Sequence, residues 1–291
     1  MQTFKKPEGK SLIHESYDRL LAAWGVQLHE LDVPTKYGST HLIISGHKEN
    51  PPLLLFHGVG DHSALMWIYN IQELSKHFYV IAIDTMGGPG KSQPNEAYYK
   101  SFELSSWIHD VINQLHLGKV HIAGVSYGSY IASYFTIKNP NQVHNVVCMA
   151  GGMKVNMLRM IMIFLPEALF PTEKNTKKLL RKLTAPQSDV FEKNQELMLQ
   201  WTYLLKFFNN RSMMFHKVAE IPQEELSILR DKAIFLIGEY DRLANYPKAI
   251  KHLAVNQMNV KIVANAGHGI NHEQPDLINR EIIQFLTKVS V

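Results

Sequence analysis

The distribution of apolar and polar residues along the chain predicts buried strands alternating with amphipathic helices. Four apolar runs are continuous rather than alternating, namely "PPLLLFHG" (51–58), "HFYVIAIDT" (77–85), "KVHIAGVS" (119–126) and "VHNVVCMAGG" (143–152). Continuous apolar runs of this length are typical of strands that are buried on both faces of a parallel sheet. The segments between the runs have helical periodicity, as in "ALMWIYNIQELSKH" and "SFELSSWIHDVINQLHL". Repeated strand–helix units predict an α/β fold with a doubly wound, mostly parallel sheet.

The two ends of the chain extend this pattern. After an N-terminal helical segment (1–24), "VQLHELDVPT" and "GSTHLIISG" alternate in polarity and predict an antiparallel pair at the sheet edge. After residue 230 the alternation of strands and helices resumes. It predicts strand "KAIFLIGEYD", helix "YPKAIKHLAV", strand "NVKIVANAG" and a helix from about Gln274 to Lys288. We therefore assign 1–152 and 230–291 to one α/β core.

The segment 153–229 interrupts the core and has the pattern of helices without a buried strand. An insertion between two strands of such a sheet lies over the carboxyl edge, where ligands bind in open α/β folds. We therefore predict a helical lid or cap. Flexible methionine side chains can form an adaptable apolar pocket, so Met157 and Met160 are candidate pocket residues. Simple packing of the cap helices is the alternative explanation for these methionines.

One helix expected within this insertion has a basic face. Its cations lie at helical spacing, opposite a leucine-rich face, and are Lys174, Lys177, Lys178, Arg181 and Lys182. A solvated face of a lid helix explains them better than contact with an anionic membrane surface, so we expect no membrane partner.

Composition places the chain among ordinary globular enzymes. Of its 291 residues, 45% are hydrophobic and 19% are charged, and the net charge of +4 does not require a nucleic-acid partner. No apolar stretch reaches the roughly 18 residues of a membrane span, and the N-terminus lacks the apolar core of a signal peptide. A single cysteine, Cys148, excludes an internal disulfide and lies among apolar neighbours, which indicates a buried thiol. We expect a cytoplasmic protein.

The stretch "DTMGGPGKSQP" (84–94) resembles a phosphate-binding loop at first sight. That pattern requires a glycine five residues before Gly90, and this chain has Thr85 there. Pro89 also lacks the N–H group that such a loop uses to bind phosphate. The stretch is therefore not expected to bind a nucleotide.

A candidate nucleophile lies in "AGVSYGSY". The run from Gly124 to Gly128 matches Gly-x-Ser-x-Gly, with Ser126 at its centre. This pattern marks a sharp strand-to-helix turn, in which small flanking residues let the strand and the helix approach closely. The match alone is a weak signal. Its position between a buried strand and an apolar helix strengthens it.

A serine nucleophile needs a histidine to accept its proton and a carboxylate to orient that histidine. In this topology both partners follow the nucleophile along the chain, on loops after later strands. Asp241 and His268 occupy such positions, with Glu239 and His272 as rivals. The spacing of the two histidines could suit zinc on a helix, but Gly269 indicates a loop and no further ligand cluster is evident. We expect no metal.

The oxyanion formed during acyl transfer requires hydrogen-bond donors. "FHGVGDH" follows the first core strand, and His57 and Gly58 turn the chain there. The backbone N–H groups of Val59 and Tyr127 are therefore the candidate donors. For the His57 side chain we expect a structural hydrogen bond.

The motifs "FHGVGDHSALMW", "DTMGGPGKS", "AGVSYGS", "LIGEYDRLA" and "AGHGINHEQP", in this order, resemble the α/β-hydrolase superfamily across nearly the whole chain. "SYDRLLAAWGV" is similar to the N-terminal segment of one group of bacterial carboxylesterases. The resemblance implies that 84–94 is a turn beside the active site, and that no cofactor is needed. One residue departs from the pattern, since many relatives have histidine where this chain has Val125.

These observations predict a serine hydrolase that cleaves a small-molecule carboxylic ester with a small or medium apolar acyl group, through an acyl-enzyme on Ser126. A carbon–carbon bond hydrolase, an acyltransferase or a perhydrolase could use the same triad. A non-enzymatic ligand-binding protein on this fold is the alternative of a different class. It usually arises by loss of a triad residue, and all three are present here.

Overall fold

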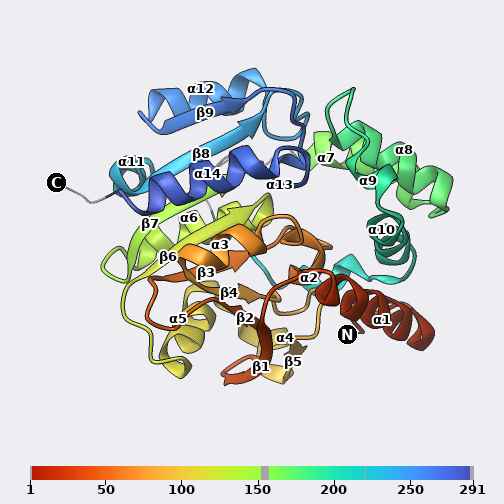
Figure 1. Ribbon diagram of the computed structural model, residues 1–291, viewed down its shortest axis with the longest axis horizontal. Helices are drawn as coiled ribbons and strands as arrows, with labels where there is room; N and C mark the ends of the chain where they lie inside the picture. Colours follow the sequence, from red (N-terminus) through yellow and green to blue (C-terminus); the bar gives the residue numbers. More distant parts are fainter. Residues whose placement is uncertain (1, 152–156, 220, 289–291) are drawn as a thin grey trace.

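A central mixed sheet organises the computed structural model, which describes residues 2–151, 157–219 and 221–288 (Figure 1). Its strands in chain order are β1 (Leu28–Thr35), β2 (Gly38–Ser45), β3 (Pro52–Phe56), β4 (Tyr79–Ile83), β5 (Gln93–Pro94), β6 (Val120–Val125), β7 (Val143–Met149), β8 (Ala233–Gly238) and β9 (Asn259–Val263). Across the sheet the order is β1-β2-β4-β3-β6-β7-β8-β9, and the short β5 pairs with β2.

The sheet is antiparallel at one end and parallel elsewhere. β2 is antiparallel to β1, β4 and β5, whereas every pair from β4 to β9 is parallel. Every residue of β6 and β8 is buried, as the continuous apolar runs predicted. The predicted α/β class with a mostly parallel sheet is confirmed. In the antiparallel pair only β1 forms the edge, because β2 also pairs with β4.

Helices cover both faces of the sheet. The core helices are α1 (Pro7–Ala22), α2 (Ser63–Met66), α3 (Ile71–His77), α4 (Glu96–Ser101), α5 (Leu104–Gln114), α6 (Tyr127–Lys138), α11 (Ile228–Lys232), α12 (Pro247–Val255), α13 (Ile270–Glu273) and α14 (Pro275–Leu286). One buried cluster packs α1, α2, α3 and α14 against residues such as Leu53 and Leu55. The other packs α5, α6 and α12 against Leu54 and Phe56. Each fully buried leucine contributes about 1.5–3 kcal/mol of transfer free energy.

Two segments that were each predicted as one helix are divided in the structure. "SFELSSWIHDVINQLHL" contains the end of α4 and then α5, because Glu103 caps the second helix. The Glu103 carboxylate accepts hydrogen bonds from the N–H groups of Ser105 (3.0 Å) and Ser106 (2.5 Å). "ALMWIYNIQELSKH" similarly forms α2 and α3, and buried Asn70 lies between them, donating to Asn279 Oδ1 at 2.9 Å.

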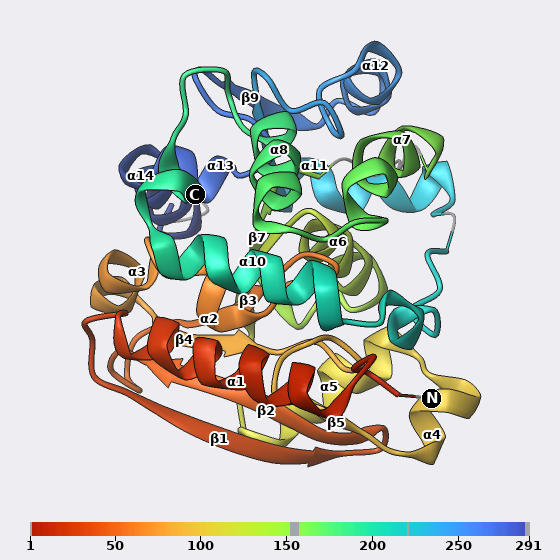
Figure 2. The same ribbon diagram turned by 90° about the vertical axis from the view of Figure 1, so that its right-hand side faces the viewer.

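Between β7 and β8 the chain forms a group of helices that we call the cap. Its elements are α7 (Met157–Ala168), α8 (Glu173–Leu183), α9 (Val190–Lys193), α10 (Gln195–Phe207) and the 3₁₀ turns η1 (Asn210–Met213) and η2 (Gln223–Ser227). α7, α8 and α10 lie together on the side of the molecule that faces the viewer in Figure 2. The predicted boundary between core and insertion, at residues 152 and 153, falls outside the described residues.

The helix α1 joins the core to the cap. It runs beside α10 (Figure 2). Ser16 Oγ donates to Glu196 Oε1 at 2.6 Å, and Arg19 forms an ion pair with the same carboxylate at 2.9 Å. The N-terminal helical segment therefore contacts α10 of the cap as well as the core.

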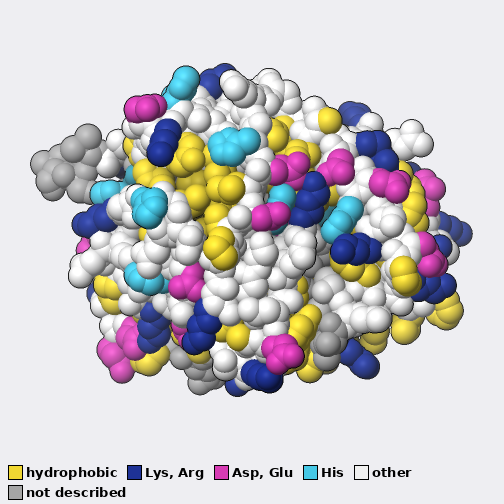
Figure 3. Space-filling model, turned by 90° about the horizontal axis from the view of Figure 1, so that it is seen from below, with side chains coloured by type: hydrophobic (Ala, Val, Ile, Leu, Met, Phe, Trp, Pro, Cys, Tyr) yellow, Lys and Arg dark blue, Asp and Glu magenta, His cyan; other side chains and the backbone are white. Residues whose placement is uncertain are grey.

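The surface carries charges of both signs. On the face shown in Figure 3, basic and acidic side chains are interspersed rather than gathered by sign.

Among the described residues, no helix combines the length and the apolar character that crossing a bilayer would require.

Candidate active site

Ser126 sits at the sharp turn between β6 and α6, in a strained backbone conformation. Its φ is 57° and its ψ is −113°, a region that costs a non-glycine residue about 1–3 kcal/mol. The flanking glycines make this turn possible because strand and helix almost touch. A methyl group on Gly124 would lie 2.1 Å from the carbonyl oxygen of Gly128, and one on Gly128 would lie 2.2 Å from that of Phe56. The turn therefore requires glycine at positions 124 and 128 for steric reasons.

Two later loops bring a histidine and an aspartate to this serine. His268 Nε2 lies 3.0 Å from Ser126 Oγ, and His268 Nδ1 lies 3.0 Å and 3.1 Å from the two carboxylate oxygens of Asp241. The Asp241 side chain is fully buried, and its Oδ1 also accepts the N–H groups of Leu243 (2.8 Å) and Ala244 (3.0 Å). Nδ1 therefore carries the proton, and Nε2 is free to accept a hydrogen bond from the serine hydroxyl.

The pKa of His268 is raised above its ordinary value. Burial alone lowers it, since a charged imidazolium loses its hydration. The charge and the hydrogen bond of Asp241, together with the charge of Glu273, outweigh this effect. An imidazole in this position is a stronger base than a free histidine.

The two candidate oxyanion donors belong to segments that lie close to the serine. Tyr127 directly follows Ser126, and the loop that carries Val59 passes close by, since a methyl group on Gly58 would lie 3.5 Å from Ser126 Cβ. No hydrogen bond between described residues occupies the N–H group of Val59 or Tyr127. The His57 ring holds this loop, because its Nε2 accepts the Thr85 N–H at 2.9 Å and its Nδ1 donates to the Gly58 carbonyl at 2.8 Å.

The rival residues have other partners. Glu239 is exposed, and its Oε2 accepts the N–H of Asn265 at 3.1 Å. His272 is buried against the Leu65 carbonyl at 3.0 Å, and burial lowers its pKa to about 4. Within the described ranges, no cluster of three or more histidine, cysteine or carboxylate side chains is arranged to hold a metal ion.

The loop 84–94 folds around a carboxylate of its own. Asp84 Oδ2 accepts the Lys91 N–H at 2.8 Å, and its Oδ1 accepts the Ser63 N–H at 2.9 Å. The Lys91 ammonium forms ion pairs with Asp18 (2.6 Å) and Glu30 (2.5 Å), from α1 and β1. A phosphate-binding loop would direct its N–H groups and its lysine at a ligand. Here the N–H and the ammonium of Lys91 bind protein carboxylates instead.

Cys148 is buried, as its apolar neighbours predicted. Burial raises the pKa of its thiol to about 11, and the Ser133 hydroxyl lies 3.2 Å from its sulfur. A thiol with so high a pKa is a poor nucleophile at neutral pH.

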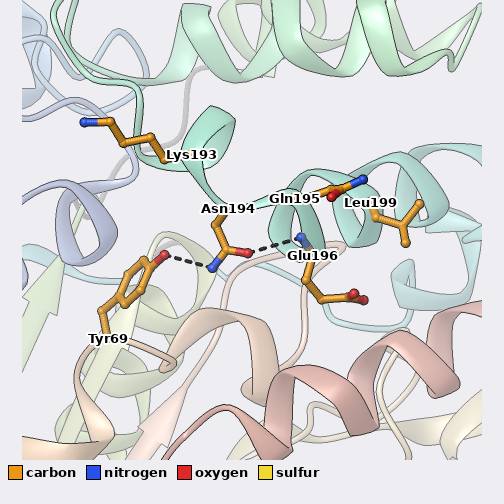
Figure 4. Close-up of a pocket in the computed structure, with 6 residues that line it drawn as sticks. All are labelled: Tyr69, Lys193, Asn194, Gln195, Glu196 and Leu199. Carbon is orange, nitrogen blue, oxygen red and sulfur yellow. Dashed lines mark hydrogen bonds between the residues drawn. The ribbon is translucent and has the colours of Figure 1, made fainter.

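An open pocket of about 670 Å³ lies at the start of α10 (Figure 4), and Ser126, Asp241 and His268 are not among the residues that line it. Asn194 caps α10 there by accepting the N–H of Glu196 at 3.1 Å, and it donates to the Tyr69 hydroxyl at 3.1 Å.

Of the two methionines predicted to line a substrate pocket, Met160 is partly buried on α7, and the side chain of Met157 lies outside the described part of the structure. Their role remains a prediction.

Glu273 contacts the histidine loop and was not singled out from the sequence. Its Oε1 accepts the N–H of Gly267 at 2.9 Å, one residue before His268. The only sequence signal was a carboxylate five residues after the candidate base.

Known proteins resemble this chain over most of its length. Residues 51–275 match the family model described as alpha/beta hydrolase fold. The chain is 26% identical over 293 residues to carboxylesterase YbfK of Bacillus subtilis, covering 97% of this chain and 96% of that protein. It is 27% identical over 279 residues to the uncharacterized carboxylesterase nap of the same bacterium, covering 94% and 91%. The crystal structure of naproxen esterase from B. subtilis superposes with a TM-score of 0.84 at 22% identity, covering 97% of this chain and 100% of that one.

Proposed function

The chain belongs to the α/β-hydrolase fold family, and on that premise we propose that it is a carboxylesterase-like serine hydrolase with Ser126 as its nucleophile. The observation that carries the proposal is the continuous hydrogen-bond chain from Ser126 through His268 to Asp241. The similarity to bacterial carboxylesterases, which spans more than nine-tenths of both chains, supports ester hydrolysis as the reaction.

In the first half of the reaction, His268 Nε2 removes the proton from Ser126 Oγ while that oxygen attacks the ester carbonyl carbon. The carbonyl oxygen becomes an oxyanion, for which the N–H groups of Val59 and Tyr127 are the donors. Asp241 keeps the Nδ1 proton in place and stabilises the imidazolium that forms. His268 then gives its proton to the leaving alcohol, and the acyl group remains on Ser126.

In the second half, a water molecule takes the place of the alcohol. His268 accepts a proton from this water, whose oxygen attacks the acyl carbonyl carbon and forms a second oxyanion in the same place. Collapse of that intermediate breaks the bond to Ser126 Oγ, which regains its proton from His268. The carboxylic acid leaves, and the enzyme returns to its starting state without a metal or a cofactor.

We assign the choice of acyl group to the cap. Its helix α7 is rich in methionine and leucine, and the segment that follows α8 contacts the His268 loop. We propose that α7 provides an apolar lining above Ser126 for a small or medium apolar acyl chain, with Met157 and Met160 as its contacts.

The single buried thiol requires no oxidising compartment, which is the basis for our proposal that the protein is cytoplasmic.

Product analysis tests this function against other reactions of the same triad. The purified protein is incubated with p-nitrophenyl butyrate, alone and with added alcohol or hydrogen peroxide, and the acyl products are quantified. We expect butyric acid as the main product in each case. A dominant new ester or peracid would indicate an acyltransferase or a perhydrolase. No turnover of any ester, with cleavage of a vinylogous diketone, would indicate a carbon–carbon bond hydrolase.

A further inference from the structure

The end of α8 packs directly onto the loop that carries His268. The carbonyl oxygen of Leu183 accepts the backbone N–H of His268 at 2.5 Å. A methyl group on Gly267 would lie 2.4 Å from that carbonyl oxygen and 2.7 Å from Thr184 Cα. Only glycine permits an approach this close. The cap is thus in van der Waals contact with the backbone of the residue next to the candidate base.

Glu273 links the two segments from the other side. One carboxylate oxygen, Oε2, accepts the N–H of Ala185 in the cap at 2.7 Å. The other, Oε1, accepts the N–H of Gly267 in the histidine loop at 2.9 Å. The side chain comes from α13, so a single carboxylate connects the core, the cap and the histidine loop. Hydrogen bonds from backbone N–H groups to a carboxylate are among the stronger neutral–charged contacts in proteins.

The same carboxylate acts electrostatically on the imidazole. The charged groups that raise the pKa of His268 are Asp241, on the loop after β8, and Glu273, in α13. The cap segment facing Glu273 contributes uncharged groups, namely the Ala185 N–H and the Ser188 hydroxyl. Burial is the largest cause that raises the pKa of Glu273, and the charge of Asp241 adds to it. The hydrogen bonds from Ala185, Gly267 and Ser188 act in the opposite direction.

We propose that Glu273 is a positioning residue for His268, fixing the cap segment after α8 to the histidine loop so that the imidazole stays aligned between Ser126 and Asp241. This inference rests on the proposed function, because it assigns His268 the role of base. It also identifies which part of the cap is fixed to the core, since the residues that follow α8 cannot separate from the histidine loop without breaking these contacts.

Two substitutions separate the charge of Glu273 from its hydrogen bonds. Glu273→Gln keeps the length of the side chain, removes the charge and leaves only one acceptor oxygen for two N–H donors. We expect kcat/KM at its high-pH plateau to fall roughly tenfold or more, and its apparent pKa to fall, because the charge of Glu273 helps to raise the pKa of His268. Glu273→Asp keeps the charge but withdraws it by one methylene. It should lower the plateau at an unshifted apparent pKa.

A measurement that does not depend on catalysis accompanies the kinetics. Backbone hydrogen exchange in peptides covering 183–187 and 265–269 should be faster in Glu273→Gln than in the wild type, because the Ala185 and Gly267 N–H groups lose an acceptor. The matched control is Glu239→Gln, which changes an exposed carboxylate that accepts the N–H of Asn265 in the neighbouring loop. It should leave the plateau, the apparent pKa and the exchange of 183–187 unchanged.

The outcomes distinguish this inference from the proposed function. A wild-type protein that hydrolyses no ester would contradict the function. The hydrogen exchange would still test whether Glu273 fixes the cap segment after α8 to the histidine loop. An active wild type, combined with a Glu273→Gln variant that lacks either the pKa shift or the faster exchange, would overturn the role of Glu273. If Glu273→Gln fails to fold, Glu273→Asp decides, and a wild-type plateau in that variant would overturn the proposal.

Discussion

His268 Nε2 lies 3.0 Å from Ser126 Oγ, although 142 positions separate the two residues in the chain. Ser126 follows β6 and His268 follows β9, and the parallel strands between them end at the same edge of the sheet. The contact is therefore a consequence of the fold, because parallel strands deliver their following loops to one side. Proton transfer from Ser126 to His268 in the proposed reaction requires this hydrogen bond.

Removal of the nucleophile should abolish ester turnover. Ser126→Ala is expected to lower kcat for p-nitrophenyl butyrate by about 10³-fold or more, leaving the residual rate that binding and oxyanion stabilisation provide. The matched control is Ser227→Ala, which removes an exposed hydroxyl that donates to the Glu224 carbonyl. Retention of most activity by Ser126→Ala would show that another residue is the nucleophile.

The acid can be tested without changing the size of its side chain. Asp241→Asn should lower kcat by about 10⁴-fold while the protein remains folded, because an amide no longer holds the proton on His268 Nδ1. Thermal unfolding measured by circular dichroism checks the fold. If Glu239→Gln lost activity instead, and Asp241→Asn stayed active, the acid would be Glu239.

The rate should depend on pH in a defined direction. Only neutral His268 can accept the serine proton, so kcat/KM for a neutral ester should rise with pH through the pKa of this histidine. Because the pKa of His268 is raised, this midpoint should lie above the value of an ordinary histidine, about 6.5. A pH–rate profile on p-nitrophenyl acetate measures it. A midpoint well below that value would contradict the assigned environment of the base.

Chelators should leave the rate unchanged. His272 is buried against a backbone carbonyl, and the described residues hold no cluster suited to a metal. Dialysis against EDTA followed by the ester assay is the measurement. Activity that is lost on dialysis and regained with added zinc would revive the metal site considered for His268 and His272.

Acyl chain length should affect kcat/KM through the cap. Each CH₂ group that the substrate buries is worth roughly 0.8 kcal/mol, so two more carbons should raise kcat/KM up to about tenfold until the pocket is full. A series of p-nitrophenyl esters from acetate to decanoate, kept below micelle concentrations, measures this. Met157→Ala or Met160→Ala should shift the preferred length, whereas Leu31→Ala on the edge strand β1 should not. A flat series unaffected by either methionine variant would mean that these side chains only pack the cap.

Local pattern and strand order were sufficient to select candidate residues for the site. The run from Gly124 to Gly128 predicted the turn, and the ends of two later strands gave Asp241 and His268 as candidates, which the structure places next to Ser126. Glu273 could not be found in this way, because its two hydrogen-bond partners come from different segments. Ala185 lies in the cap and Gly267 in the histidine loop. Their proximity depends on how α8 packs against the core, and the periodicity of apolar residues does not predict that packing.

Helix boundaries illustrate the same limit. The apolar periodicity before and after Phe102 runs through the break between α4 and α5, so it predicted a single helix. The structure ends α4 at Ser101 because the Glu103 carboxylate takes up the first N–H groups of α5. For the stretch 84–94, Thr85 and Pro89 already argued against phosphate binding, and the structure adds that the Lys91 ammonium is paired with Asp18 and Glu30.

Covalent labelling shows whether Ser126 is a reactive nucleophile. The protein is incubated with a fluorophosphonate at neutral pH, its intact mass is measured, and the modified peptide is sequenced. We expect one adduct per chain, located on Ser126, absent from Ser126→Ala and formed much more slowly in Asp241→Asn. An unmodified wild-type protein, or an adduct on a different residue, would contradict it.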